Sequence, residues 1–308
     1  MPLDRLDEAL SVLLATPSGR APPEQRAAFI QSAIARGMNL ERIRVARRGR
    51  HILYAAMANV LPGRTLMLIS GTPTSDAAAD AAIVVIDEVV GQYASADLCL
   101  MQVLLESQDA LLRGVYELCG FHVLAQLVYL EGPGRQQPWH LPGPDWNIIC
   151  YSQARHAEFA RAIEQSYQQT LDCPGLSGVR DIEDVIVGHK ASGEFDPRNW
   201  IVVRQGEKAA GVLLLARTPA SDALELVYIG LCPWARGRGL GGELMKLALS
   251  RVTEMGCARL STAADSQNIP AMRLYARHGM RAIGSRIAMI RTYPQRGGSS
   301  STIRSQFA

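Results

Sequence analysis

The stretch CPWARGRGLGGELM, residues 232–245, places four glycines and two arginines directly before a run with the apolar pattern of a helix. The first backbone N–H groups of a helix have no partner within the helix, and the helix dipole makes this end positive. Glycines let the backbone approach a ligand closely. The stretch therefore predicts a site for a phosphate-bearing ligand.

Two phosphate-binding patterns fit this loop. The first is the dinucleotide fingerprint G-x-G-x-x-G, which Gly237 to Gly242 satisfy, with Asp265 further along the chain. A doubly wound sheet needs several more strand–helix units after such a loop. The chain after the loop holds only two helices and ends in an apparent antiparallel pair of strands at 280–284 and 286–292. A dinucleotide fold is therefore the weaker alternative.

The second pattern is [Q/R]-x-x-G-x-[G/A], which Arg236, Gly239 and Gly241 satisfy. It is followed by NIPAMRLYARHGM, residues 268–280, which matches N-x-x-A-x-x-L-Y-x-x-x-G-F except that Met280 replaces the final Phe. The two motifs in this order resemble those of the GNAT N-acetyltransferase superfamily, over residues 146–293. The resemblance implies that the loop binds the diphosphate of coenzyme A and that the pantetheine arm lies between two splayed strands.

The resemblance also implies the residues of the site. Those expected to bind the cofactor are Leu231, Cys232, Arg236, Gly237, Arg238, Gly239, Leu240, Gly241, Gly242, Asn268 and Tyr275. Tyr275 would be near the thioester sulfur, where a phenol with a pKa near 10 suits a general acid. A backbone N–H of Leu231 or Cys232 would donate to the oxyanion. A core aromatic at Tyr275 stays open as the alternative.

The general base is expected in the strand LELVYIGLCP, residues 224–233. This strand is similar to one in the tandem-domain mycothiol synthases, whose Glu at the same spacing from the loop is the base. The resemblance carries that role to Glu225 alone, and burial beside a cofactor would raise its pKa toward the working range. A solvent-facing Glu225 is the alternative. Between the next helices, Ser166, Tyr167, Asp172 and Cys173 are candidates for contact with the acceptor.

The two halves of the chain are similar to each other. The segment SQDALLRGVYELCGF (107–121) lies over SQNIPAMRLYARHGM (266–280) without gaps, at an offset of 159 residues that pairs Tyr116 with Tyr275. This match indicates a tandem duplication. Where the offset predicts a phosphate loop, the first half has GTPTSDAAADAA (71–82), whose two Asp would repel a diphosphate.

We therefore predict an α/β (α+β) fold of two tandem GNAT-like domains, each a mixed, largely antiparallel, twisted sheet flanked by helices. The expected boundaries are a degenerate domain at 1–132, a Pro/Gly-rich linker at 133–145, an acyltransferase domain at 146–294 and a flexible tail at 295–308. The first domain would support the sheet or shape the acceptor pocket.

Composition excludes several other classes. Of the 308 residues, 48% are hydrophobic and 20% charged, and the net charge is +3, which is typical of a globular chain without a nucleic-acid function. The basic run at 42–50 fits a strand with a solvated face. No apolar run reaches the roughly 18 residues of a membrane span, so we expect a cytoplasmic protein. The six cysteines are scattered and lack metal-ligand spacing, so no metal is expected.

The predicted function is transfer of an acetyl or other acyl group from acetyl-CoA, or another acyl-CoA, to an amine of a small molecule or peptide. Two alternatives remain: a catalytically silent acyl-CoA sensor or interaction module, and a dinucleotide-dependent oxidoreductase. The sequence does not predict the acceptor, the acyl length or the oligomeric state, and a homodimer remains open.

Overall fold

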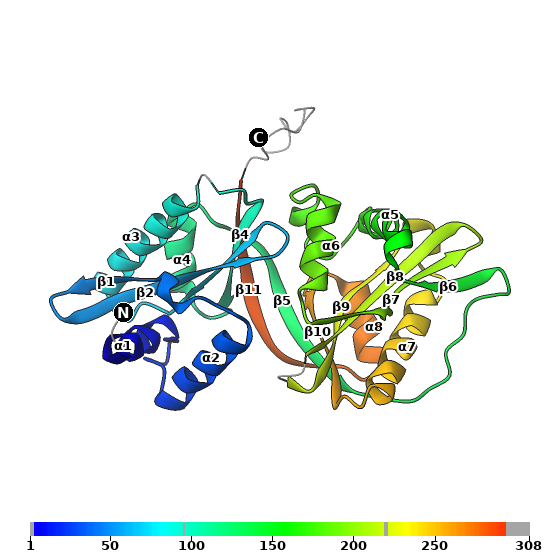
Figure 1. The fold of residues 1–308 in the computed structure, drawn as a ribbon, viewed down its shortest axis with the longest axis horizontal. Helices are drawn as coiled ribbons and strands as arrows, with labels where there is room; N and C mark the ends of the chain where they lie inside the picture. Colours follow the sequence, from blue (N-terminus) through cyan, green and yellow to red (C-terminus); the bar gives the residue numbers. More distant parts are fainter. Residues whose placement is uncertain (1–2, 95, 219–220, 294–308) are drawn as a thin grey trace.

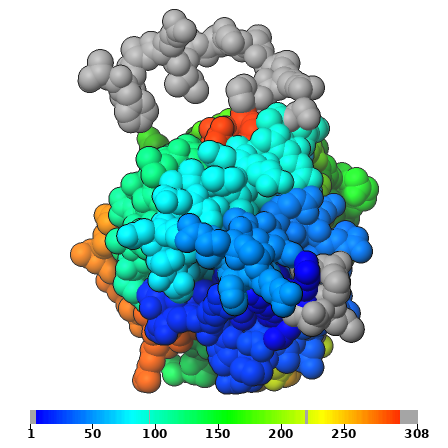
Figure 2. Space-filling model, turned by 90° about the vertical axis from the view of Figure 1, so that its left-hand side faces the viewer, coloured from blue at the N-terminus to red at the C-terminus, as the bar shows by residue number. Residues whose placement is uncertain are grey.

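One sheet of eleven strands runs through the whole molecule (Figure 1). The structure is a computed structural model that describes residues 3–94, 96–218 and 221–293. Along the sheet the strand order is β1-β2-β3-β4-β11-β5-β10-β9-β8-β7-β6. Seen from the β1 end, the surface is formed mostly by the first half of the chain (Figure 2). The predicted flexible tail at 295–308 lies outside the described residues.

The two halves have the same order of elements. The first contains α1 (Leu3–Leu13), α2 (Pro23–Ala35), β1 (Ile43–Arg48), β2 (His51–Leu61), β3 (Thr65–Ser70), α3 (Asp76–Gln92), β4 (Leu100–Glu106), α4 (Ala110–Leu118) and β5 (His122–Pro133). The second adds β6 (Trp146–Cys150) and then repeats the order with α5 (His156–Tyr167), α6 (Ile182–Lys190), β7 (Glu194–Gln205), β8 (Lys208–Thr218), β9 (Ala223–Leu231), α7 (Leu240–Glu254), β10 (Arg259–Asp265), α8 (Ile269–Arg277) and β11 (Arg281–Thr292).

The predicted offset of the duplication is visible in the element boundaries. Each of the last three elements of the first half starts 159 residues before its counterpart: Leu100 and Arg259 for β4 and β10, Ala110 and Ile269 for α4 and α8, and His122 and Arg281 for β5 and β11. The fold class predicted from the sequence, a tandem pair of mixed sheets flanked by helices, is confirmed.

Helices cover both faces of the sheet, because apolar side chains alternate along its strands. In β2, Tyr54 and Ala56 pack in the cluster formed with α3 and α4, whereas Met57 packs with α1. In β8, Leu213 packs with α7 and Val212 packs with α5 and α6. Each half therefore has two cores, one on each face.

The closing strands of the two halves are exchanged. The second part of β5 pairs with β10, from Leu127 opposite Asp265 to Pro133 opposite Arg259. β11 pairs with β4, from Arg286 opposite Glu106 onward, and also with β5. The last strand of each half therefore completes the part of the sheet built by the other half, and β5 and β11 lie side by side in the middle of the molecule (Figure 1).

The predicted pair of closing strands at 280–284 and 286–292 is wrong. Residues Arg281–Thr292 form one strand, β11. Its register against β5 shifts between Ala282 and Gly284, so the glycine lies at an irregularity within the strand. A glycine inside a strand pattern is typical of such a bulge as well as of a turn.

The segment 134–145 between the halves runs along α7. The N–H of Arg135 donates to the carbonyl oxygen of Leu249 at 3.1 Å, and the N–H of His140 donates to a carboxylate oxygen of Glu243 at 2.8 Å. A side chain at Gly134 would contact Val252. This segment is thus bound to the helix that follows the predicted phosphate loop.

In the first half, the counterpart of the phosphate loop is covered by the end of α1. The N–H of Thr72 donates to the carbonyl oxygen of Ala15 at 2.9 Å, and Gly71 lies against the carbonyl oxygen of Val12. The hydroxyl of Tyr116, which is fully buried, is hydrogen-bonded to the hydroxyl of Ser70 at 2.8 Å. This half has no open loop at the position where the second half has one.

In the described ranges, none of the helices combines the length and the apolar character that a membrane crossing requires.

Gly71→Ala tests the contact that covers this loop. Its added Cβ would lie 1.9 Å from the carbonyl oxygen of Val12, so we expect the free energy of unfolding to fall by about 3 kcal/mol through overpacking. Gly91→Ala in α3 is the control, because no atom lies within 4 Å of the added Cβ, and this helical substitution should raise stability by up to about 1 kcal/mol. Urea denaturation measures both, and similar values for the two variants would contradict the close packing.

Candidate functional site

A gap opens between the parallel strands β9 and β10. They pair at only three positions: Ala223 with Arg259, Leu224 with Leu260 and Glu225 with Ser261. Beyond Glu225, β9 continues to Leu231 against β8, while β10 continues to Asp265 against β5. Each strand therefore keeps one partner, and the two edges that face each other separate. This is the splay that the sequence resemblance implied.

The end of β9 presents the backbone N–H of Leu231 to the gap. The register with β8 shifts between the pairs Leu214–Tyr228 and Leu215–Leu226, so β9 bulges at this point. The N–H of Cys232 donates to the carbonyl oxygen of Ala210 at 2.8 Å and is not available to an oxyanion, contrary to our expectation. Because N–H groups alternate in direction along a strand, that of Leu231 faces the gap.

The glycine loop lies at the end of β9 and begins α7. Gly237 and Gly239 have φ values of 76° and 81°, in the left-handed region that favours glycine. Gly239 is the N-cap of α7, and no side chain caps this helix end. The N–H groups of Gly242 and Glu243 donate to the carbonyl oxygen of Gly239, which leaves those of Leu240 and Gly241 open to an anionic ligand, and the helix dipole favours negative charge there.

The two arginines of the loop differ in what they contact. The guanidinium of Arg236 donates to the carbonyl oxygens of Leu231 at 3.0 Å, Ser166 at 3.1 Å, Gln168 at 2.6 Å and Gln169 at 3.2 Å. It thereby ties the end of α5 to the end of β9. The side chain of Arg238 is exposed and lies over the ring of Trp234.

Tyr275 lies in the core beneath the gap. Its side chain is 5% exposed, in the same cluster as Leu224 and Leu226. Burial and the negative charge of Asp172 raise the pKa of its phenol, while the adjacent Thr262 side chain lowers it. The Thr262 hydroxyl also donates to the carbonyl oxygen of Leu226 at 2.9 Å, across the gap. The phenol is therefore protonated at neutral pH, beside the point where the strands separate.

Glu225 belongs to the last residue pair before the gap. Its side chain is half-buried. Burial raises the pKa of its carboxyl group, against the lowering influence of the Thr218 side chain and of the charge on Arg36. Arg36 follows α2, so the first half of the chain contributes a positive charge to the surroundings of Glu225. A carboxylate with a raised pKa is a stronger base than an exposed one.

Glu225 and Tyr275 approach the gap from opposite faces of the sheet. Leu224 and Leu226 point to the face covered by α7 and α8, where Tyr275 lies. Glu225 stands between them in the strand and therefore points to the other face. A group held in the gap would have a carboxylate on one side and a phenol on the other.

The loop between α5 and α6 reaches across the end of the gap. A carboxylate oxygen of Asp172 accepts the N–H of Asp265 at 3.0 Å, and a carboxylate oxygen of Asp265 accepts the N–H of Cys173 at 3.3 Å. Cys173 has a φ of 44°. Asn268 is the N-cap of α8, and its side-chain oxygen accepts a hydrogen bond from the N–H of Ala271.

The other two predicted acceptor contacts lie within the fold. Ser166 is buried, and its hydroxyl is 2.8 Å from that of Tyr228. The hydroxyl of Tyr167 is 3.1 Å from Nε2 of His189. Burial raises the pKa of the Tyr167 phenol to about 12. Both residues therefore pack against Tyr228 of β9.

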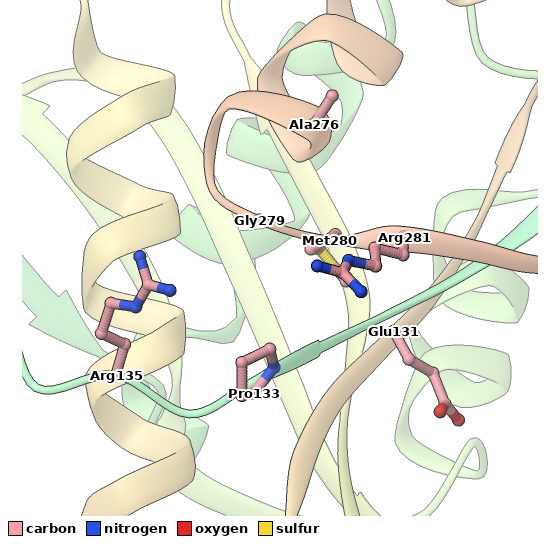
Figure 3. A pocket seen from close by; sticks show the side chains of 7 residues that line it. All are labelled: Glu131, Pro133, Arg135, Ala276, Gly279, Met280 and Arg281. Atoms are coloured by element: carbon pink, nitrogen blue, oxygen red, sulfur yellow. The ribbon is translucent and has the colours of Figure 1, made fainter.

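A separate cavity of about 460 Å³ lies beside the end of α8 (Figure 3). It is lined by Glu131, Pro133, Arg135, Ala276, Gly279, Met280 and Arg281. None of the predicted site residues is among them, so this cavity is distinct from the gap.

Sequence reasoning missed Thr262 and Arg36. Thr262 is one of several polar residues in β10, whose sequence is RLSTAAD, so no local signal distinguishes it. Arg36 is more than a hundred residues away from Glu225 in the chain, and no pattern in the sequence links the two. Only the folded structure brings them together.

Comparison with known proteins agrees with this arrangement. Over most of its length the chain has the tandem GNAT fold. Its structure aligns with that of a tandem GNAT protein from the clavulanic acid biosynthesis pathway with a TM-score of 0.53 and 13% identity, and the alignment covers 96% of this chain and 95% of that protein. It also matches a GCN5-related N-acetyltransferase from Sphaerobacter thermophilus with a TM-score of 0.61 and 13% identity, covering 90% and 88% of the two chains.

The family model matches within the second half of the chain. Residues 150–280 match the model of the Acetyltransferase (GNAT) family, so the second half of the chain contains a GNAT domain, and the tandem GNAT neighbour supports a tandem architecture. Mycothiol acetyltransferase of Streptomyces bingchenggensis is 31% identical over 141 residues, which are 45% of this chain and 40% of that protein. Mycothiol acetyltransferase of Beutenbergia cavernae is 30% identical over 103 residues, or 33% and 34%. The matching segments thus span less than half of these relatives.

Replacing each loop arginine by glutamine separates their roles. Arg236→Gln removes charge-assisted bonds to backbone carbonyls, and we expect the free energy of unfolding to fall by about 2 kcal/mol. Arg238→Gln changes an exposed side chain and should alter stability by less than about 0.5 kcal/mol. Chemical denaturation provides the measurement, and equal losses in both variants would contradict the structural role of Arg236.

Proposed function

We propose that this protein is an N-acyltransferase that moves an acetyl or other short acyl group from acyl-CoA to an amine. One observation supports this most strongly: the glycine loop with open helical N–H groups lies at the end of the same strand that separates from β10. A ligand with a diphosphate on this loop can extend a narrow arm into the gap. The family match over 150–280 supports acyl transfer in general.

The site residues supply the three functions that direct transfer needs. Glu225 accepts a proton from the amine, whose nitrogen then forms a bond to the thioester carbonyl carbon. The N–H of Leu231 stabilises the carbonyl oxygen as it gains negative charge. As the carbon–sulfur bond breaks, Tyr275 donates its proton to the sulfur, and the products are an amide and a free thiol.

The acceptor amine approaches from the face on which Glu225 points. That face is bordered by α6 and by Arg36 from the first half. Tyr129 of β5 is also close, because the charge of Glu225 contributes to raising the pKa of its phenol, together with the larger influence of burial. The first half therefore helps to form the acceptor side, although its own counterpart of the loop is covered.

Ligand-induced stabilisation tests the identity of the carrier. A ligand present at 100 times its Kd raises the free energy of unfolding by about 2.7 kcal/mol. We expect acetyl-CoA to raise the melting temperature and NADH to leave it unchanged. Stabilisation by NADH alone would favour the dinucleotide alternative, and stabilisation by acetyl-CoA without transfer to any amine in an acceptor library would favour a silent sensor.

Substitutions of Glu225 and Tyr275 have different expected effects in an assay of released thiol. Glu225→Gln removes the base, and we expect kcat/KM to fall by about 10²–10⁴-fold. Tyr275→Phe removes the proton donor while keeping the ring in the core, so kcat should fall with little change in stability. Leu118→Ala, at an exposed position on α4, is a control for substitution elsewhere.

The pH profile identifies the base. Because burial raises the pKa of Glu225, kcat/KM should rise with pH through a value above the usual carboxyl range, and this limb should vanish in Glu225→Gln. An unchanged acidic limb in that variant would assign the base to another group.

A further inference from the structure

The face of the sheet toward which Glu225 points is accessible on the central strands. On this face α1 packs on β2 and β3, and α5 packs on β8 and β9. Between these helices, Ala263 of β10 is exposed, and no atom lies within 4 Å of a Cβ added at Gly284 of β11. We call the residues of this area the central patch, which consists of Ser261, Ala263, Tyr129, Gly284 and Arg286.

The strand register places the central patch beside Glu225. Glu225 lies opposite Ser261 of β10, and Tyr129 of β5 lies opposite Ala263, two residues further along β10. Because side chains alternate along a strand, these residues share the face of Glu225. Arg286 of β11 pairs with the residue two positions before Tyr129, so Arg286 and Tyr129 are diagonal neighbours on the same face. The patch therefore extends from Glu225 to Arg286.

The charge of Arg286 is only loosely engaged within the protein. Its guanidinium contacts a carboxylate oxygen of Glu106 at 3.4 Å, and its side chain is 42% exposed. Strong charge-assisted hydrogen bonds between nitrogen and oxygen are shorter, at roughly 2.7–2.9 Å. Glu131, the neighbouring carboxylate on β5, contacts Arg259 at 2.9 Å and is therefore already paired. Arg286 is thus available to a second anion.

Arg36 adds a second positive charge on this side of the sheet. It follows α2, and within the described ranges of the chain it forms no ion pair. Its charge lowers the pKa of the Glu225 carboxyl group, against the larger raising influence of burial. An acceptor that carries only a protonated amine would add a further positive charge between Arg36 and Arg286. A negative group on the acceptor would balance these charges.

We propose that the acceptor carries an anionic group, a carboxylate or a phosphate, which Arg286 binds while the amine lies at Glu225. This inference rests on the proposed function and adds the class of acceptor. Two strands, β10 and β5, separate β9 from β11, so these outer strands are on the order of 14 Å apart at the usual strand spacing. The side chains of Glu225 and Arg286 cover part of this distance, so the amine and the anion are several bonds apart. The small residues Ala263 and Gly284 leave room for the atoms that connect them.

An acceptor library arranged in matched pairs tests the inference. Each pair contains an anionic amine and its neutral analogue, such as γ-aminobutyrate and its amide, or phosphoethanolamine and ethanolamine, and released thiol is measured at saturating acetyl-CoA. We expect kcat/KM to be about tenfold or more higher for the anionic member of the preferred pair. The pair with the larger ratio shows whether the group is a carboxylate or a phosphate. Neutral amines that react as well as their anionic partners in every pair would overturn the inference and leave acyl transfer standing, whereas transfer to no amine would refute the proposed function itself.

Substitutions on the two sides of the Arg286–Glu106 contact separate binding from packing. Arg286→Gln should raise KM for the preferred anionic acceptor about tenfold, with little change in kcat, in KM for acetyl-CoA or in the kinetics of the neutral partner. Glu106→Gln is the matched control: it removes the same contact but keeps the charge of Arg286, so KM for the anionic acceptor should stay the same or fall. Equal increases of KM in both variants would assign the effect to the lost contact and overturn the binding role of Arg286. Thermal melting checks that both variants are folded, and little change is expected because surface ion pairs contribute little to stability.

Discussion

The separation of β9 from β10 is the constraint on which the rest of the site depends. A parallel pair that stops after three residue pairs leaves backbone groups without partners, and such groups are costly when they are buried. Side chains replace part of the missing pairing: the Thr262 hydroxyl donates to the carbonyl oxygen of Leu226, and Arg236 donates to that of Leu231. β8 and β5 hold the outer edges, so the sheet stays continuous around the opening.

Neighbouring residues of the loop contribute to the site by different physical means. The glycines provide conformations with positive φ, Arg236 joins α5 to β9, and the start of α7 presents N–H groups. Arg236 is hydrogen-bonded to backbone carbonyl oxygens, whereas the charge of Arg238 lies over the ring of Trp234 at the surface. The positive potential of this region thus comes from backbone geometry and from the exposed side chain of Arg238.

The sequence predicted the features that depend on short segments. The loop, the helices that follow it and the offset between the halves are all encoded in local patterns, and the structure has them where they were expected. The exchange of β5 and β11 was not predictable from the sequence. The two strands have equal lengths and equivalent positions in the repeat, so the sequence of neither strand specifies which half of the sheet that strand joins. The division of this segment into strands at 280–284 and 286–292 was wrong, since a glycine such as Gly284 marks bulges and strand ends alike. The approach of Arg36 to Glu225 and the bonding of Arg236 arise only from packing between distant segments.

The exchanged strands also bear on how the molecule can move. Because β11 is built into the sheet of the first half and β5 into that of the second, neither half holds a complete sheet by itself. Hinge rotation of one half against the other would have to break the central strand ladder between β5 and β11. For the same reason the chain should unfold cooperatively as a single unit, and cleavage of the segment 134–145 would not release two independent parts.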